Sequence, residues 1–551
     1  MHVPNTYLPK RKTQLIMATS GADLLLESLI SHGIKHLFSL SGNQILSLYD
    51  ATIGRDIDIL HTRHEATAVH MADGWGRLTE TPGVALLTAG PGHCNAISAL
   101  YVARMAESPL ILLSGNAPKG QIGTGAFQEM DQVAIAQPVC KAAWMVEDPE
   151  RIGADIARAY AIATSGRPGP VFLSLPSDIL EATTSQQAEN PANKDAPLTL
   201  TAAQIEQLLD LLNSAQEPLI LGGPAMARPK RWHEVEALAQ TINIPALPME
   251  SPRGVDDPWL HQATNCLAQA DLVLLIGKKL DFTLKFGQPP FFAEHCRFVQ
   301  IDADADQLQK DKNTIWSAQA DPLQATQQLH AAAQQRPWQE NAWSAEVTTQ
   351  RQSTPSEWEN LATQHPIHPL ALCRDVQPYL DNGAILISDG GEFGQWVQAG
   401  LEASCRLING PSGSIGSSLG LGLAARLCHP DRPVFVFQGD GTCGYHPADF
   451  DTALRYNLPI VTLVGNDAQW NAEHQLQIKN YGPDRTVGCD LLPTRYDKMI
   501  EALGGHGEFV EQVDELEPAI ERSLASGLPS CINVTIDAAA APTFRAAPGG
   551  H

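Results

Sequence analysis

The chain has 551 residues, which is too long for one hydrophobic core and predicts about three domains. Its 61 acidic and 37 basic residues give a net charge of −24, which argues against nucleic acid or a membrane surface as a partner, although a local basic pocket for an anionic substrate stays possible. The ten cysteines include no Cys-x-x-Cys pair, no apolar run reaches the roughly 20 residues of a membrane helix, and no apolar signal core opens the chain. We therefore expect a cytoplasmic protein with reduced thiols.

The first periodic segment opens at Ser20 and runs to Gly33, with leucines on one helical face. Strands and helices then alternate to about residue 185, which predicts a doubly wound parallel sheet over residues 14–185. Residues 1–16 form a polar extension for which we expect disorder, and the polar segment 184–198 is expected to be a linker.

A second α/β unit is expected over residues 198–335, with strands near 218–223, 271–277 and 297–302. The strands at 218–223 and 271–277 end in glycine, as in nucleotide-binding folds, yet no complete Gly-x-Gly-x-x-Gly opens a helix after any of the three. A second linker, with a short helix near 356–364, leads to a third unit over residues 366–540. The expected fold class is therefore α/β, with three doubly wound parallel-sheet domains.

The most informative stretch is 433–470. Its strand Val434–Phe437 ends at Gly439-Asp440-Gly441, a helix is expected over 448–457, and a second buried strand ends at Gly465-Asn466-Asp467. Consecutive parallel strands usually lie close together in a sheet. We therefore expect the two aspartates at neighbouring carboxyl ends of strands, where open α/β sheets bind ligands.

Two carboxylates side by side repel each other unless a cation lies between them. Oxygen donors suit Mg²⁺ or Ca²⁺, and Mg²⁺ usually shares its ligand sphere with a phosphate group. The backbone N–H groups just after Asp440 are suited to bind that phosphate. The alternative is that Gly-Asp-Gly is only a turn and Asp440 caps a helix, and the second acidic strand end argues against it.

The same stretch carries a family resemblance. Gly439-Asp440-Gly441 followed by Asn466-Asp467 resembles the fingerprint of thiamine diphosphate-dependent enzymes, and RYNLPIVTLVGND (455–467) resembles the branch of acetolactate synthase, benzaldehyde lyase and 2-hydroxyacyl-CoA lyase. The resemblance implies that Asp440, the side chain of Asp467 and the backbone oxygen of Gln469 hold Mg²⁺ against the diphosphate. Family members commonly have asparagine in place of Asp467, so this site would be one negative charge richer.

Three segments carry the resemblance in the first domain. HTRHEATAVHMADGWGR (61–77) matches at Glu65, which the family implies bonds the aminopyrimidine ring of the cofactor and moves the proton that activates it. A carboxyl group buried against a flat ring has a raised pKa and can donate a proton near neutral pH. TAGPGHCNAISAL (88–100) places Asn95 at the family's asparagine. IGTGAFQEMDQVAIAQPVCKAAW (122–144) resembles acetolactate synthase, and the resemblance implies that Gln128 points at the substrate. Without the resemblance, Glu65 would be only an acid in a first helical turn.

In the third domain, Gly390 and Gly391 follow a strand and correspond to glycines that bind the diphosphate through backbone N–H groups. GSIGSSLGLGLAAR (413–426) places Ile415 where relatives have the apolar residue that bends the cofactor. The catalytic residues implied by the resemblance are Glu65 and Gln128. The implied cofactor-binding residues are Asn95, Gly390, Gly391, Ile415, Gly439, Gly441, Thr442 and Asn466.

The central domain of relatives holds FAD, ADP or CoA in some members and nothing in many. GKKLDFTLKFGQPP (277–290) resembles the CoA-linked branch, in which an arginine commonly lies near Lys278 or Lys279. This departure leaves nucleotide binding an open alternative.

The resemblance implies an enzyme that uses thiamine diphosphate and Mg²⁺ to form or cleave a carbon–carbon bond in a small molecule, as an acetolactate synthase-like carboligase or decarboxylase of a 2-keto acid. The rivals are a 2-hydroxyacyl-CoA lyase, a benzaldehyde lyase-type acyloin lyase and a non-catalytic homologue. Leu476 and Asn471 stand where acetolactate synthases have tryptophan and glycine, which predicts a changed acceptor site. We also expect a homodimer or homotetramer with each site between Glu65 of one chain and Asp440 of another.

Overall fold

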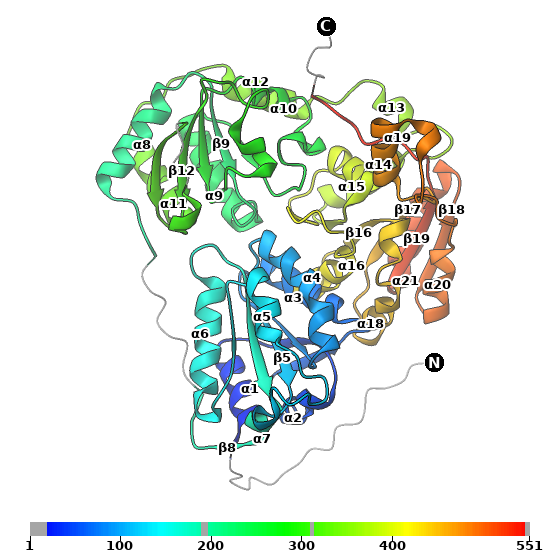
Figure 1. The fold of residues 1–551 in the computed structure, drawn as a ribbon. Helices are drawn as coiled ribbons and strands as arrows, with labels where there is room; N and C mark the ends of the chain where they lie inside the picture. Colours follow the sequence, from blue (N-terminus) through cyan, green and yellow to red (C-terminus); the bar gives the residue numbers. More distant parts are fainter. Residues whose placement is uncertain (1–18, 189–196, 309–312, 546–551) are drawn as a thin grey trace.

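The computed structural model describes residues 19–188, 197–308 and 313–545, and it contains three lobes, each built on a parallel sheet (Figure 1). The first lobe is blue to cyan, the central lobe green and the third lobe yellow to red. This arrangement confirms the expected fold class. The N-terminal extension and most of the first linker lie outside the described residues.

The first sheet has six parallel strands in the order β3-β2-β4-β5-β7-β6. The helix expected at Ser20 forms as α1, because the Ser20 hydroxyl accepts from Asp23 N (3.1 Å) and the Asp23 carboxylate accepts from Ser20 N (3.0 Å). The strands are β2 (His36–Leu40), β3 (Asp58–His61), β4 (Gly83–Leu87), β5 (Leu110–Asn116), β6 (Ala142–Met145) and β7 (Pro170–Pro176). The helices are α1 (Gly21–Ser31), α2 (Leu46–Ala51), α3 (Glu65–Thr79), α4 (Pro91–Met105), α5 (Gln132–Ala136), α6 (Ile152–Thr164) and α7 (Ser177–Glu181), and the short strands β1 (Thr19–Ser20) and β8 (Thr183–Thr184) pair antiparallel.

The third sheet repeats this order of parallel strands, as β15-β14-β16-β17-β19-β18. Its strands are β14 (Ile385–Ser388), β15 (Arg406–Ile408), β16 (Val434–Gly439), β17 (Val461–Asn466), β18 (His506–Val510) and β19 (Ser530–Thr535). Its helices are α14 (Pro369–Asp381), α15 (Gly391–Gly400), α16 (Ser418–Cys428), α17 (Asp440–Cys443), α18 (Phe450–Arg455), α19 (Asn471–Tyr481), α20 (Tyr496–Leu503) and α21 (Leu516–Ser526). The helix expected over 448–457 is shorter than predicted, because a 3₁₀ turn precedes α18.

The central sheet has five parallel strands in the order β10-β9-β11-β12-β13. Its strands are β9 (Pro218–Gly222), β10 (Ala246–Pro248), β11 (Leu272–Ile276), β12 (Arg297–Asp302) and β13 (Thr314–Gln319), and its helices are α8 (Ala202–Ser214), α9 (Pro229–Ile242), α10 (Ala263–Cys266) and α11 (Pro322–Ala333). The strands β10 and β13 escaped the sequence analysis. The first has only three residues, and β13 alternates buried and exposed side chains at the edge of the sheet.

The segment expected to be a second linker is more ordered than predicted. It contains α12 (Trp343–Gln352) as well as α13 (Trp358–Leu361). The Trp343 side chain is buried in the core of the central lobe, and its Nε1 donates to Pro218 O at 2.8 Å. We attribute the error to the polar composition of α12, which offers only one short apolar face.

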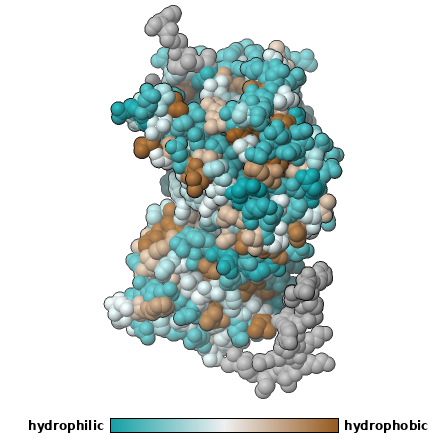
Figure 2. Space-filling model, turned by 90° about the vertical axis from the view of Figure 1, so that its right-hand side faces the viewer, coloured by the Kyte–Doolittle hydropathy of each residue, from teal (hydrophilic) through white to brown (hydrophobic). Residues whose placement is uncertain are grey.

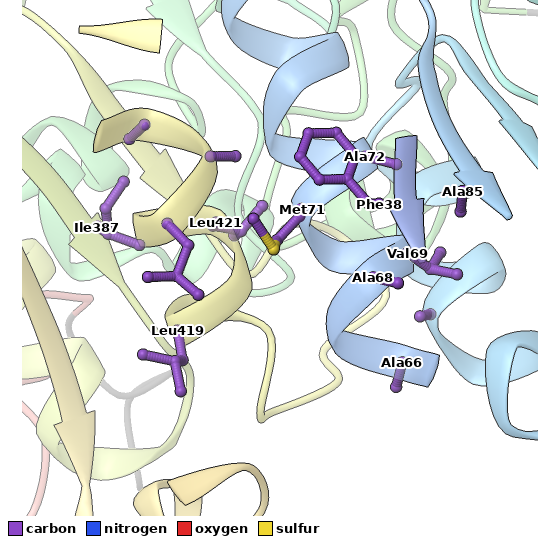
Figure 3. Close-up of a cluster of buried hydrophobic side chains, with 14 of the residues drawn as sticks. Phe38, Ala66, Ala68, Val69, Met71, Ala72, Ala85, Ile387, Leu419 and Leu421 are labelled. Carbon is purple, nitrogen blue, oxygen red and sulfur yellow. The ribbon is translucent and has the colours of Figure 1, made fainter. Parts of the chain in front are cut away.

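The first and third lobes share one hydrophobic core. Helix α3 packs against α16, and residues of both lobes form a continuous buried cluster that includes Met71 and Leu421. Figure 3 shows alanines of α3 on one side of Met71, and Leu419, Leu421 and Ile387 on the other. At Gly420 a Cβ would lie 2.6 Å from the Cβ of His70, so this glycine allows the two helices to approach closely.

Candidate active site

The two aspartates expected at strand ends lie on adjacent strands. Strands β16 and β17 are paired, with Gly439 opposite Gly465, so Asp440 and Asp467 follow at the same edge of the sheet. Asp440 is the first residue of α17 and is 3% exposed. Strand β16 thus continues to Gly439 rather than turning at it, and the sequence analysis had ended this strand two residues too early.

Burial disfavours the charged form of both carboxylates. Desolvation raises the pKa of Asp440, and the negative charge of Asp467 raises it further. Burial is also the main cause of the raised pKa of Asp467. Among the described residues, Asp440 Oδ2 and the side-chain Oε1 of Gln469 have no hydrogen-bond partner. A cation bound between these oxygens would stabilise the charged form of both carboxylates.

A cavity of about 350 Å³ opens beside these carboxylates. Gly439 and Gly391 border it, and a Cβ at either position would meet no atom within 4 Å, so both backbones are open to a ligand. Gly391 has φ +85°, a conformation that favours glycine. Nine of the predicted site residues line this cavity: Gly390, Gly391, Ile415, Gly439, Asp440, Gly441, Thr442, Asp467 and Gln469.

Asp389 holds two sides of this cavity together, and the sequence analysis missed it. Its fully buried carboxylate accepts from Gly390 N (2.8 Å), Gly416 N (3.1 Å) and Ser418 N (3.0 Å). The glycine turn after β14 and the loop that carries Ile415 are therefore joined through one side chain. The signal that could have indicated Asp389 is its position directly after strand β14, because Asp440 and Asp467 were predicted from their positions at the ends of strands.

The predicted residues of the first domain form a second group. Glu65 is the first residue of α3, and Asn95 Nδ2 donates to Glu65 Oε2 at 2.9 Å. Gln128 has φ +59°, and its Oε1 accepts from Gln44 Nε2 at 3.2 Å. Gln44 in turn accepts from the Thr88 hydroxyl at 2.6 Å. Gln44 is a further residue that sequence reasoning missed, because its partners are 44 and 84 residues away.

These two groups are not brought together within the chain. Glu65, Asn95 and Gln128 are absent from the lining of the 350 Å³ cavity. Asn466 is also absent from it, because its side-chain amide donates to Thr494 O (3.0 Å) and Asn533 Oδ1 (3.1 Å) on the far side of β17. The structure thus presents two half-sites, one on the first lobe and one on the third.

The mouth of the cavity carries residues that no motif indicated. Arg253 of the central lobe lies 4.0 Å from Glu392, whose pKa is raised by burial. The C-terminal segment passes beside it: Ala541 N donates to Glu392 Oε1 at 3.2 Å. Phe544 stacks on His261 of the central lobe with ring centroids 4.9 Å apart. The described part of the C-terminal segment therefore borders the cavity.

Other classes of site find no support in the described residues. They contain no group of three or more histidine, cysteine, aspartate or glutamate side chains arranged for a metal ion, so the pair described above would need neutral oxygens to complete a site. All ten cysteines are free thiols. Within the same ranges, no helix is both long and apolar enough to cross a bilayer.

Three parallel-sheet lobes, with a carboxylate pair at one sheet edge and a helix-borne glutamate on another lobe, define a cofactor-dependent α/β enzyme. The chain belongs to the thiamine pyrophosphate enzyme family: residues 19–135 match its N-terminal TPP binding domain, 205–329 its central domain and 389–534 its C-terminal TPP binding domain. It is therefore a thiamine diphosphate-dependent enzyme, as the sequence analysis predicted.

Relatives with two kinds of name cover nearly the whole chain. The chain is 33% identical to the acetolactate synthase large subunit of Mycobacterium tuberculosis, over 93% of this chain and 95% of the relative. It is 31% identical to 2-hydroxyacyl-CoA lyase 2 of Caenorhabditis elegans (92% and 87%) and 29% identical to 2-hydroxyacyl-CoA lyase of Oryza sativa (95% and 96%). These names match the expected branch and leave the substrate open between the two.

Proposed function

We propose that the cofactor is held through Mg²⁺, with Asp440, the side chain of Asp467 and the backbone oxygen of Gln469 as ligands. The observation that carries this proposal is the buried carboxylate pair, since one oxygen of Asp440 has no partner among the described residues and a cation would relieve the repulsion. When bound, thiamine diphosphate supplies an electron sink for bond making and breaking beside a carbonyl group. Backbone N–H groups at Gly391, Gly441 and Thr442 would hold its diphosphate end.

Metal removal tests this part of the proposal. After the protein is stripped of metal and cofactor, activity should return only when Mg²⁺ and thiamine diphosphate are both supplied. Full activity in excess EDTA, with metal removal verified by elemental analysis, would contradict it.

Glu65 would exchange a proton with the aminopyrimidine end of the cofactor. Asn95 donates to one carboxylate oxygen of Glu65, so the amide fixes the orientation of the carboxyl group and leaves its other oxygen free for this exchange. Gln128, held by Gln44, would contact the substrate from the same lobe.

A second copy of the chain would complete the site. The separation of the two half-sites supports this, because neither Glu65 nor Gln128 reaches the cavity that holds Asp440. Apolar side chains are exposed near both half-sites, as Phe127 (70%) in the first lobe and Val487 (79%) and Leu492 (80%) in the third show. Figure 2 shows exposed apolar residues on the upper and lower parts of one face. We therefore propose a homodimer, or a tetramer of two such dimers.

The proposed reaction is carboligation or decarboxylation of a 2-keto acid, with an acceptor or donor larger than pyruvate. Leu476 lines the cavity and is half exposed, whereas a tryptophan at this place would bury up to about 250 Å². Purified protein with thiamine diphosphate and Mg²⁺ should be offered pyruvate, benzoin and a 2-hydroxyacyl-CoA separately. Turnover of pyruvate alone with kcat/KM of about 10⁴ M⁻¹s⁻¹ or more would contradict the proposal that the acceptor or donor is larger than pyruvate.

A 2-hydroxyacyl-CoA lyase is the second candidate, and one observation favours it. A cavity of about 480 Å³ lies where the central lobe meets the first lobe, and its lining mixes cations with carboxylates. Arg167 and Lys278 are paired with Glu107 and Asp281, whereas Arg104, Lys141 and Lys279 line the cavity without an ion pair among the described residues. These three cations suit the phosphates of CoA or of another nucleotide, including ADP or FAD. Cleavage of the 2-hydroxyacyl-CoA in the product screen would favour this candidate over the 2-keto acid.

For either reaction we propose a cytoplasmic location, with which the free cysteines are consistent.

A further inference from the structure

A buried arginine without an acid partner lies where the three lobes meet. Arg228 is the residue before α9 and is 6% exposed. Its Nη2 donates to the backbone oxygen of Glu107 in the first lobe. Among the described residues, no acceptor contacts its Nε or its Nη1. Two donor nitrogens of a charged group are thus left unsatisfied away from solvent, which is costly in a folded protein.

The neighbouring arginines differ, because each is bonded to a carboxylate. Arg77 chelates Asp73 through Nε (2.8 Å) and Nη2 (2.5 Å). The other pairs are Arg231 with Glu80 (3.1 Å), Arg406 with Glu250 (3.0 Å), and Arg167 with Glu107 and Asp302. Each of these carboxylates bonds another arginine, so Glu80 and Asp73 act on Arg228 only through their charge and no carboxylate bonds it directly.

The charge of Arg228 persists despite its burial. Desolvation and the charges of Arg231 and Arg77 lower its pKa to about 9, which still leaves the guanidinium mostly protonated at neutral pH. A water molecule could accept a hydrogen bond here, but an anion would accept a stronger, charge-assisted one.

A small cavity adjoins this guanidinium. It has a volume of about 20 Å³, and its charged lining residues are Arg228, Arg77 of the first lobe, Arg406 of the third lobe and Glu250, whose carboxylate is paired with Arg406. Since one water molecule needs about 10–15 Å³ on this measure, the cavity admits a single small species and is too small for phosphate or a carboxylate. Three arginines outnumber the one carboxylate, that of Glu250, so the lining favours an anion over a cation. The cavity shares no lining residue with the cavity beside Asp440.

We propose that this cavity is a structural binding site for a monoatomic anion, chloride in the cell, which bonds Arg228 and joins the three lobes. Arg77 already bridges two lobes by donating to Ile408 O at 2.7 Å, and the anion adds the central lobe to this junction. The site is independent of the cofactor, so its occupancy should change the stability of the protein without requiring catalysis.

Bromide in crystals of the full chain tests the site directly. Crystals grown in sodium bromide should show an anomalous peak beside the Arg228 guanidinium, and the peak should be absent in Arg228→Met. A density peak without anomalous signal at this position would mean that water satisfies the arginine, and it would overturn the proposal.

Thermal unfolding in solution provides a second test, at constant ionic strength in chloride or in gluconate, which is too large to enter. Chloride should raise the Tm by on the order of 2 °C and the effect should saturate. The response should vanish in Arg228→Met and persist in Arg231→Gln, a change on the same helix at an arginine paired with Glu80. Equal Tm values of the wild type in both salts, or a chloride response retained by Arg228→Met, would contradict the proposal. If Arg228→Met does not fold, the bromide experiment on the wild type decides alone.

Discussion

The first and third lobes have the same strand order and yet present different chemistry at equivalent strand ends. Strand β4 of the first sheet holds the place that β16 holds in the third. After β4 the chain turns through residues 88–90 into α4, whereas after β16 it places the carboxylate of Asp440 at the start of α17. The acid of the first lobe comes instead from Glu65, at the start of α3. One scaffold thus carries two functions through a few residues at the strand ends.

The two lobes also differ in how their acids are held. Asn95 contacts Glu65, so that acid has a partner within its own lobe. In the third lobe, burial and the charge of Asp467 instead raise the pKa of Asp440. Asp467 accepts a hydrogen bond from Gln469 N at 3.2 Å, but no cationic side chain of the described chain pairs with either carboxylate, and Asp440 Oδ2 has no partner there. We infer that the third lobe depends on a bound cation and that the first lobe is preorganised without one.

The largest expected effect comes from Asp440→Ala. Loss of one carboxylate of the pair should lower kcat/KM by at least about a thousandfold, because the metal loses a ligand. The metal-free variant should nevertheless unfold at the same or a higher temperature than the metal-free wild type, because a buried repulsion is removed. Asp451→Ala, at a partly exposed ion pair of the same lobe, is the matched control. Normal activity of Asp440→Ala would refute the asymmetry between the lobes.

The next effect concerns the acid of the first lobe. Glu65→Gln should bind thiamine diphosphate with nearly wild-type affinity, measured by quenching of tryptophan fluorescence, and should lower kcat by about a hundredfold. Glutamine keeps the shape of the side chain and removes the transferable proton. Glu147→Gln, at an exposed position of the same lobe, should leave both values unchanged. A hundredfold loss of cofactor affinity in Glu65→Gln would mean that Glu65 binds the cofactor rather than moving a proton.

Mixing the two inactive variants tests whether the half-sites meet across chains. Equal amounts of Glu65→Gln and Asp440→Ala, allowed to exchange subunits, should recover about a quarter of the wild-type activity, because half of the dimers are mixed and one of their two sites is intact. Exchange is verified by native mass spectrometry. Absence of recovery despite exchange would indicate that each chain completes its own site.

The smallest effect concerns the contact between the two lobes within one chain. Asp449 is fully buried and accepts from Arg63 N (2.7 Å) and the Thr67 hydroxyl (2.6 Å) of the first lobe. Asp449→Asn replaces one acceptor oxygen by a donor and should lower the free energy of unfolding by about 1–3 kcal/mol in urea titrations. Asp451→Asn should change it by much less, since its ion pairs are partly exposed. Because Asp451 also reaches Arg63 of the first lobe, equal effects of the two changes would show that the buried contact adds no more stability than the partly exposed one.

Much of the candidate site could be predicted because its signals are local. Gly439-Asp440-Gly441 and Asn466-Asp467 each end an apolar run, and strand, turn and acid lie within a few residues of each other. The domain boundaries at 14–185, 198–335 and 366–540 stay a prediction, since composition alone marks them. The second linker shows the limit of composition, because α12 is polar along most of its length and still packs Trp343 into the central lobe.

The sequence by itself determined the family, the parallel strands and the acids at their ends, because apolar periodicity, caps and turn glycines act over neighbouring residues. Only the tertiary structure decided which long-range partner each polar side chain meets. Asp389 reaches the loop at Gly416, Asn466 turns toward Asn533, and Arg228 is buried at a junction where every nearby carboxylate already has an arginine. Such contacts depend on how whole sheets and helices pack against each other, and no short stretch of sequence determines which distant residues this packing brings together.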